Sequence, residues 1–209
     1  MAPVAGPLSS APFADDDAMQ DLVTTWYLEM RDPAMLRPAR MPAVEPLIMQ
    51  ARAPLPMLSR FLYTAVGGHW FWRDRLGWSY ARWMAWLDRL QLQTWVLYVD
   101  GTPAGYVELE LQAGDDVEIA YFGLMREFTG RGLGGHLLTR GIEQAWAMGA
   151  RRVWVHTCSL DGPAALANYE ARGMRQYQVE HRTIERPPTP DGPWPGWDHV
   201  APEPGPGPA

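Results

Sequence analysis

The 209-residue sequence has little cysteine and few basic residues, and both shortages restrict what the protein can be. Its one cysteine, Cys158, cannot form an internal disulfide, which is typical of proteins in the reducing cytoplasm. Lysine and arginine total 18 against 24 acidic residues, so the net charge is −6. Because nucleic-acid-binding domains carry a basic face, this balance argues against a nucleic-acid partner.

Long hydrophobic runs are also missing. No apolar stretch reaches the length that crosses a bilayer. The first residues, MAPVAGPLSS, lack the charged start and apolar core of a signal peptide. We therefore expect a cytoplasmic protein without a membrane segment.

Composition divides the chain into one domain and two tails. Residues 1–20 are rich in Ala, Pro and Asp without periodicity, so we expect a flexible N-terminal tail. Residues 186–209 contain nine prolines and several glycines, which predicts a flexible C-terminal tail. Residues 21–185 are long enough to form a single domain with its own core.

Hydrophobic periodicity within this domain predicts alternating strands and helices. Residues 31–56 contain six prolines, so we expect a partly extended segment there. Ser79 is expected to cap a helix whose apolar stripe is Trp83, Trp86, Leu87 and Leu90. The expected elements, in chain order, are a strand at 22–30, helices at 57–66 and 80–90, a hairpin at 94–111, a strand at 117–125, a helix at 136–148, a strand at 151–157, a helix opened by Pro163, and a strand at 174–184. This order predicts a mixed α/β sheet.

A glycine-rich loop joins the strand at 117–125 to the helix that follows. Glycines at this density let the backbone turn sharply and approach a ligand closely. The free N–H groups and the positive dipole end of the helix suit a phosphate or pyrophosphate, and Arg131 adds a cation. The glycines are Gly130, Gly132, Gly134 and Gly135.

Two common phosphate-binding patterns do not describe this loop well. The Gly-Lys-Ser/Thr ending of the Walker pattern is absent. A dinucleotide fingerprint could be started at Gly130 or Gly132, but the preceding strand lies late in the chain and no βαβ unit opens the protein.

The loop instead resembles the acetyl-CoA motif of the GNAT (Gcn5-related N-acetyltransferase) superfamily. The sequence TGRGLGGHLL, from Thr129, has Thr where Gln or Arg is usual. A second stretch, DGPAALANYEARGM from Asp161, resembles the closing motif of the family: Tyr169 lies on its helix, Gly173 ends it, and Met174 replaces the usual Phe. The resemblance implies a mixed, mostly antiparallel sheet flanked by helices, with a splayed strand before the glycine loop.

The resemblance also implies an activity, the transfer of an acetyl group from acetyl-CoA to a primary amine by direct attack. The acceptor would be a small molecule or an exposed protein amine, no metal would take part, and a homodimer is one expected assembly. A non-catalytic module that senses acetyl-CoA, or an interaction protein using the proline-rich tails, is the alternative. The coenzyme would be held by the amides of Phe122, Gly123 and Leu124 and by residues of the loop: Thr129, Gly130, Arg131, Gly132, Leu133, Gly134 and Gly135.

By the same resemblance, Glu118 is the first candidate for the general base, because its distance before the loop matches the catalytic glutamate of the histone-acetyltransferase branch. Glu108 and Glu110 are rivals, and His156 has the ordinary pKa best suited to the task. Tyr169 matches the family tyrosine near the coenzyme sulfur and is the candidate acid.

Other site residues follow less directly. Six of the eleven tryptophans fall between Trp70 and Trp95, and core packing is their first explanation. The second explanation is an aromatic wall of the acceptor pocket, formed by His69, Trp70 and Trp72, with Arg73 or Asp74 as further polar groups. Gly162 stands where the family often has a coenzyme-binding Asn, and Asp161 or Asn168 could substitute. We interpret Cys158 as structural.

Overall fold

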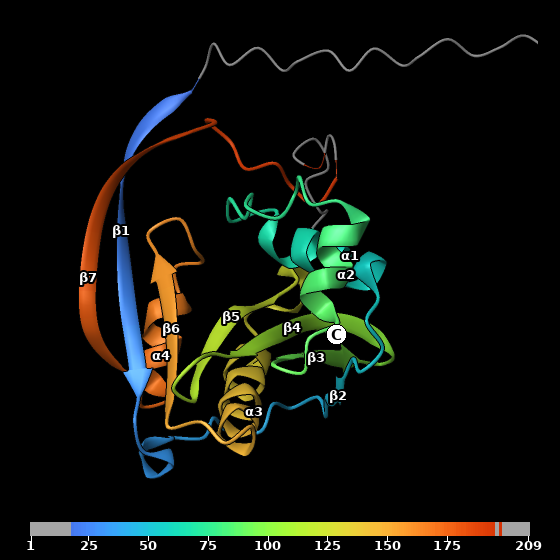
Figure 1. Ribbon diagram of the computed structural model, residues 1–209, viewed down its shortest axis with the longest axis vertical. Coiled ribbons are helices and arrows are strands. Elements are labelled where there is room, and N and C mark those ends of the chain that lie inside the picture. The colour runs from blue at the N-terminus through green and yellow to red at the C-terminus, as the bar shows by residue number, and fades with distance from the viewer. Residues whose placement is uncertain (1–17, 195–196, 198–209) are drawn as a thin grey trace, which may run out of the picture.

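The computed structural model describes residues 18–194 and residue 197. One seven-stranded sheet, in the order β2-β3-β4-β5-β6-β1-β7, runs through it (Figure 1). Its strands are β1 (Met19–Met30), β2 (Leu47–Gln50), β3 (Leu92–Val99), β4 (Thr102–Leu111), β5 (Asp116–Leu124), β6 (Arg152–Cys158) and β7 (Arg175–Arg186). Its helices are α1 (Pro56–Gly67), α2 (Tyr80–Leu87), α3 (Leu133–Ala147) and α4 (Ala165–Ala171), with 3-10 turns at Pro33–Met35 and Arg126–Phe128. Every strand pair is antiparallel except β5–β6, so the predicted mixed, mostly antiparallel sheet is confirmed.

The sheet has a core on each face, because successive residues of β4 point to opposite sides. Val107 lies in the larger core, with α3 packed over it. Its neighbour Tyr106 lies in the smaller core, beneath α1. The apolar face expected for α3 is confirmed, with Leu137 and Ile142 fully buried.

The sheet opens between β5 and β6. The parallel register between them covers only Asp116–Glu118 against Arg152–Trp154. Beyond these pairs β5 continues to Leu124 and β6 to Cys158, and the two strands diverge (Figure 1). The expected splayed strand is therefore present, and the glycine loop begins near the open end of the gap.

An arginine accounts for much of the tryptophan cluster. Arg75 is 4% exposed and its guanidinium carbon lies 4.8 Å from the ring of Trp78 and 4.3 Å from that of Trp86. It forms a 2.8 Å ion pair with Glu108, which also accepts a 3.0 Å hydrogen bond from the Trp86 indole. These tryptophans therefore have a packing role, the first explanation given above for the aromatic stretch.

The structure differs from the predicted elements most clearly at β2 and α2. The proline-rich segment contains β2, a short strand that the sequence did not indicate. Ser79 caps α2 as expected, but the helix ends at Leu87. Leu90 was placed in its apolar stripe and is 97% exposed instead, because the helix does not reach it.

The expected tails also begin elsewhere. Strand β1 starts at Met19, inside the expected N-terminal tail, and residues 1–17 lie outside the described residues. Beyond Arg186 the chain packs against the loop after α1: Asp191 pairs with Arg73 at 2.8 Å, and the Gly192 N–H donates to the Gly68 carbonyl at 2.9 Å. The rest of the expected C-terminal tail, residues 195, 196 and 198–209, lies outside the described residues. No helix in the described part is long and apolar enough to cross a membrane.

Candidate active site

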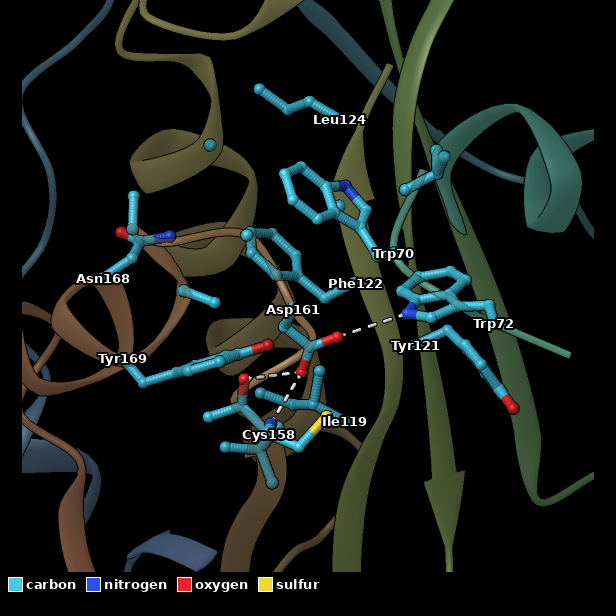
Figure 2. Close-up of a pocket in the computed structure, with 18 of the residues that line it drawn as sticks. Trp70, Trp72, Ile119, Tyr121, Phe122, Leu124, Cys158, Asp161, Asn168 and Tyr169 are labelled. Carbon is cyan, nitrogen blue, oxygen red and sulfur yellow. Dashed lines mark hydrogen bonds between the residues drawn. The ribbon is translucent and has the colours of Figure 1, made fainter. Parts of the chain in front are cut away.

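A cavity of about 640 Å³ occupies the gap between the diverging strands (Figure 2). Residues 119–124 of β5 form one wall, and the end of β6 with α4 forms the other. The glycine loop closes one end, and the loop after α1 contributes Trp70, Phe71, Trp72 and Asp74. The cavity therefore joins the two sequence motifs to a third segment that no motif had indicated.

The glycine loop fits a phosphate-bearing ligand. Gly130 and Gly132 have φ of 74° and 76°, left-handed values that favour glycine. Gly132 is the N-cap of α3 and offers no capping side chain, so the first amides of the helix stay free for an anion. At Gly135 an added Cβ would lie 2.5 Å from Arg172 Nη1 and 3.1 Å from Ala39 Cβ, which explains the glycine there.

Most of the predicted coenzyme residues reach this cavity. Arg131 does not line it, and its guanidinium carbon lies 5.6 Å from the Phe128 ring. Leu133 is fully buried in the core, so only its backbone could face a ligand. The predicted residues that line the cavity are Phe122, Gly123, Leu124, Thr129, Gly130, Gly132, Gly134 and Gly135.

Tyr169 projects from α4 into the cavity. Its ring packs edge-on against Phe122 at 5.9 Å, and its hydroxyl points toward Asp161 (Figure 2). Burial raises the pKa of the Tyr169 phenol, and the negative charge of Asp161 adds to the effect. The phenol therefore stays protonated at neutral pH and can act as a donor.

Asp161 is the most connected polar group of the cavity. One carboxylate oxygen accepts from the Thr157 hydroxyl at 2.7 Å and from the Cys158 N–H at 2.9 Å. The other accepts from the indole N–H of Trp72 at 3.4 Å (Figure 2). The sequence indicates this residue only as a substitute coenzyme contact. The signal that could have found it is an aspartate in the short turn after a strand, where a carboxylate commonly accepts from nearby backbone N–H groups.

The candidate bases are placed differently. Glu118 does not line the cavity; its carboxylate accepts from Gln112 Nε2 at 2.7 Å and lies 3.3 Å from Nδ1 of His156. His156 is half exposed and lines the cavity. The hydrogen bond with Glu118 raises the pKa of His156, burial opposes it, and the charges of Glu118, Asp161 and Asp74 raise it further.

The other two carboxylates considered as bases have partners elsewhere. Glu108 is 1% exposed and paired with Arg75, and Glu110 is paired with Arg89 at 2.7 Å. Neither lines the cavity.

Two of the three residues expected to form the acceptor wall line the cavity. Trp70 and Trp72 line the cavity, whereas the ring of His69 lies 4.5 Å from Trp197 and is not part of the lining. Phe71 between the two tryptophans has φ of 60°, a strained value for a residue with a side chain. Gly67 makes room for this loop, because a Cβ there would lie 2.1 Å from the Trp72 ring.

Comparison of the sequence with protein-family models identifies the family of this chain. Residues 59–174 match the model of the acetyltransferase (GNAT) family, which is more than half of the chain. The chain belongs to the GNAT family. No curated protein matches the sequence significantly.

Solved structures share the GNAT fold at low identity. A GCN5-related N-acetyltransferase from Kribbella flavida aligns with 81% of this chain at 16% identity and a TM-score of 0.58, but this chain covers only 60% of that protein. An aminoglycoside acetyltransferase from an uncultured soil sample aligns with 61% of this chain and 86% of its own at 16% identity and a TM-score of 0.50. A ribosomal-protein alanine N-acetyltransferase from Escherichia coli aligns with 64% of this chain and 79% of its own, also at 16% and 0.50.

GNAT proteins generally use acetyl-CoA, and the glycine loop and the open edge of β5 fit that coenzyme. Among the described residues, no group of three or more His, Cys, Asp or Glu side chains could hold a metal ion.

Proposed function

We propose that this GNAT protein is an acetyl-CoA-dependent N-acetyltransferase that acetylates a primary amine by direct attack. The observation that carries the proposal is the cavity between β5 and β6, because it connects the free helix amides of the glycine loop to Tyr169 and His156. A site for a pyrophosphate and a pair of proton-transfer groups thus lie in one continuous space.

The backbone would provide most of the coenzyme binding. Beyond Glu118, the edge of β5 that faces β6 has no strand partner, so amides among Phe122, Gly123 and Leu124 are available to the pantetheine arm and the thioester carbonyl. The first turn of α3 would hold the pyrophosphate. Acetyl-CoA itself supplies the activated acetyl group.

We propose His156 as the base and Glu118 as the residue that positions it. His156 faces the cavity, whereas the carboxylate of Glu118 is 13% exposed and engaged by Gln112 and His156. The hydrogen bond with Glu118 raises the pKa of His156, which makes its imidazole a stronger base. His156 would take the proton that the amine loses as its nitrogen–carbon bond forms.

Tyr169 would donate to the sulfur as the carbon–sulfur bond breaks, since its phenol is protonated and faces the cavity. Cys158 also lines the cavity, but burial raises the pKa of its thiol, so it is a poor nucleophile. This favours direct attack over an acyl-enzyme. With a single cysteine and an acidic composition, we place the enzyme in the cytoplasm, and dimerisation stays a prediction.

Thiol release from acetyl-CoA across a panel of primary amines, measured beside calorimetric binding of acetyl-CoA, tests the proposal. The sequence contains no lysine, so the enzyme has no lysine side chain of its own to acetylate. We expect saturable binding and amine-dependent release. Binding without release for any amine would favour the sensor, and no binding would refute both.

A matched pair of glycine variants locates the binding site. Gly134 lines the cavity, and a Cβ there would meet only Leu124 and Asn168 at ordinary contact distances of 3.6 and 4.0 Å. Gly134→Val should therefore fold and block the coenzyme. Gly77→Val, where an added Cβ meets nothing within 4 Å, is the control and should bind normally.

A further inference from the structure

Two carboxylates face the cavity without a cationic partner. Asp74 and Asp161 both line it. Within the described residues, neither forms an ion pair with an arginine or histidine. No arginine of the described chain lines the cavity either, and His156 is its one basic side chain. The acceptor side therefore carries an excess of negative charge, which attracts cations and repels anions.

Neutral donors hold both carboxylates in place. Asp74 accepts hydrogen bonds from the hydroxyls of Tyr63, at 2.7 Å, and Tyr121. Asp161 accepts from Thr157, Trp72 and a backbone N–H, as described above. These bonds orient the carboxylates without neutralising them, and a carboxylate has about four lone-pair positions, so each retains capacity for a ligand.

Aromatic rings connect the two carboxylates. The indole N–H of Trp72 binds Asp161, and the same ring packs at 4.9 Å against Tyr121, whose hydroxyl binds Asp74. Trp70 (Figure 2) adds further ring surface to the lining, and so does Phe71. Such surface favours a flat or apolar ligand body and also stabilises a neighbouring cation.

The two ends of this surface differ in chemistry. Asp161 lies beside Tyr169 and Cys158, at the end where we place acetyl transfer. Asp74 lies on the loop after α1 and accepts from the hydroxyl of Tyr63 on α1. An acceptor with one amine near Asp161 and a second positive charge near Asp74 would satisfy both carboxylates.

We propose that the acceptor is a small dication: a primary amine joined through a flat or apolar body to a second positively charged group that stays charged at Asp74. The inference rests on the proposed acetyl transfer. It excludes acceptors that carry a carboxylate or phosphate in place of the second cation.

A matched series of three amines tests the charge preference. Para-xylylenediamine, para-methylbenzylamine and para-(aminomethyl)benzoate differ only in a group that is cationic, neutral or anionic. We expect kcat/KM to fall in that order, with the diamine ahead of the monoamine by about tenfold beyond its statistical factor of about two, a difference of about 1.4 kcal/mol for tenfold. Equal values for the diamine and the monoamine, or acetylation of peptide amines alone, would overturn the proposal.

Variants at Asp74 assign the preference to that residue. Asp74→Asn should bring the diamine and the monoamine to within about twofold of each other, the statistical factor alone, while Asp74→Glu keeps part of the preference because it keeps the charge. Asp88→Asn removes an exposed carboxylate outside the cavity and should leave the preference unchanged. A preference that survives Asp74→Asn would refute the role of Asp74. Turnover of these amines without a charge preference would be a failure of this inference alone, whereas acetyl-CoA binding without turnover of any amine would be a failure of the proposed acetyl transfer.

Discussion

The indole N–H of Trp72 donates a hydrogen bond of 3.4 Å to Asp161, and both residues line the cavity between β5 and β6. The two residues are 89 positions apart in the chain, and the bond joins the loop after α1 to the turn between β6 and α4. Asp161 also accepts hydrogen bonds from Thr157 and Cys158 at the end of β6. The bond from Trp72 therefore links the acceptor side of the cavity to the strand that carries His156. Acceptor binding and the position of the catalytic groups should therefore be coupled through this contact.

The first prediction concerns that contact. Trp72→Phe keeps a ring in the cavity but removes the indole N–H. A hydrogen bond to a charged group contributes about 1.5–3 kcal/mol, and because this one is long we take the lower end: we expect the acceptor KM to rise by about tenfold with acetyl-CoA affinity unchanged. Trp95→Phe is the control, since its indole N–H binds Gln93 outside the cavity. Steady-state kinetics in both substrates measure the effect, and an unchanged acceptor KM would contradict it.

The second prediction separates His156 from Glu118. If His156 is the base, activity requires its neutral form and falls as pH drops through its raised pKa. His156→Gln should lower kcat by about 100- to 10,000-fold and remove this limb of the pH profile. Glu118→Gln removes the group that raises the pKa, so the limb should move to lower pH with a smaller loss of rate.

One acceptor is used for all three enzymes, so that its own titration is common to the profiles. The original assignment of Glu118 as the base makes the opposite prediction. In that case Glu118→Gln would show the larger loss, and His156→Gln would keep the acid limb.

The third prediction concerns Tyr169. Replacement by Phe removes only the phenol oxygen and keeps the ring that packs against Phe122. We expect kcat to fall by about 100-fold or more at every pH below the titration of the tyrosine, because the leaving sulfur loses its donor. Calorimetry should show acetyl-CoA affinity within a few-fold of the parent enzyme. Undiminished kcat would assign Tyr169 a packing role alone.

The fourth prediction concerns stability. Glu108→Gln leaves Arg75 buried among aromatic rings without its counterion, so we expect a loss of about 3–5 kcal/mol in the free energy of unfolding. Glu110→Gln, two residues along the same strand, breaks the more exposed pair with Arg89 and should cost about 1 kcal/mol or less. Urea unfolding of both variants measures the difference. Equal losses would show that burial of the Arg75 pair is not the deciding factor.

The features that the sequence determined by itself are local ones. The dense glycines after a strand predicted a turn into a helix with free amides, and they form it because positive φ at Gly130 and Gly132 is a property of the residues themselves. The helical spacing around Leu137 likewise predicted the buried face of α3, because a buried face repeats with the helix period. Tyr169 was indicated by the resemblance to the family motif.

Only the tertiary structure decided which charged side chains share the site. Glu118 was placed by its distance from the loop, but the register of the short β5–β6 ladder sets it opposite Trp154 and beside His156, partly shielded from the cavity. Asp74 reaches the cavity because the loop after α1 is fixed by its contacts with Gly67 and the C-terminal segment. Such contacts depend on strand register and loop packing between distant segments, which residue spacing along one chain does not specify.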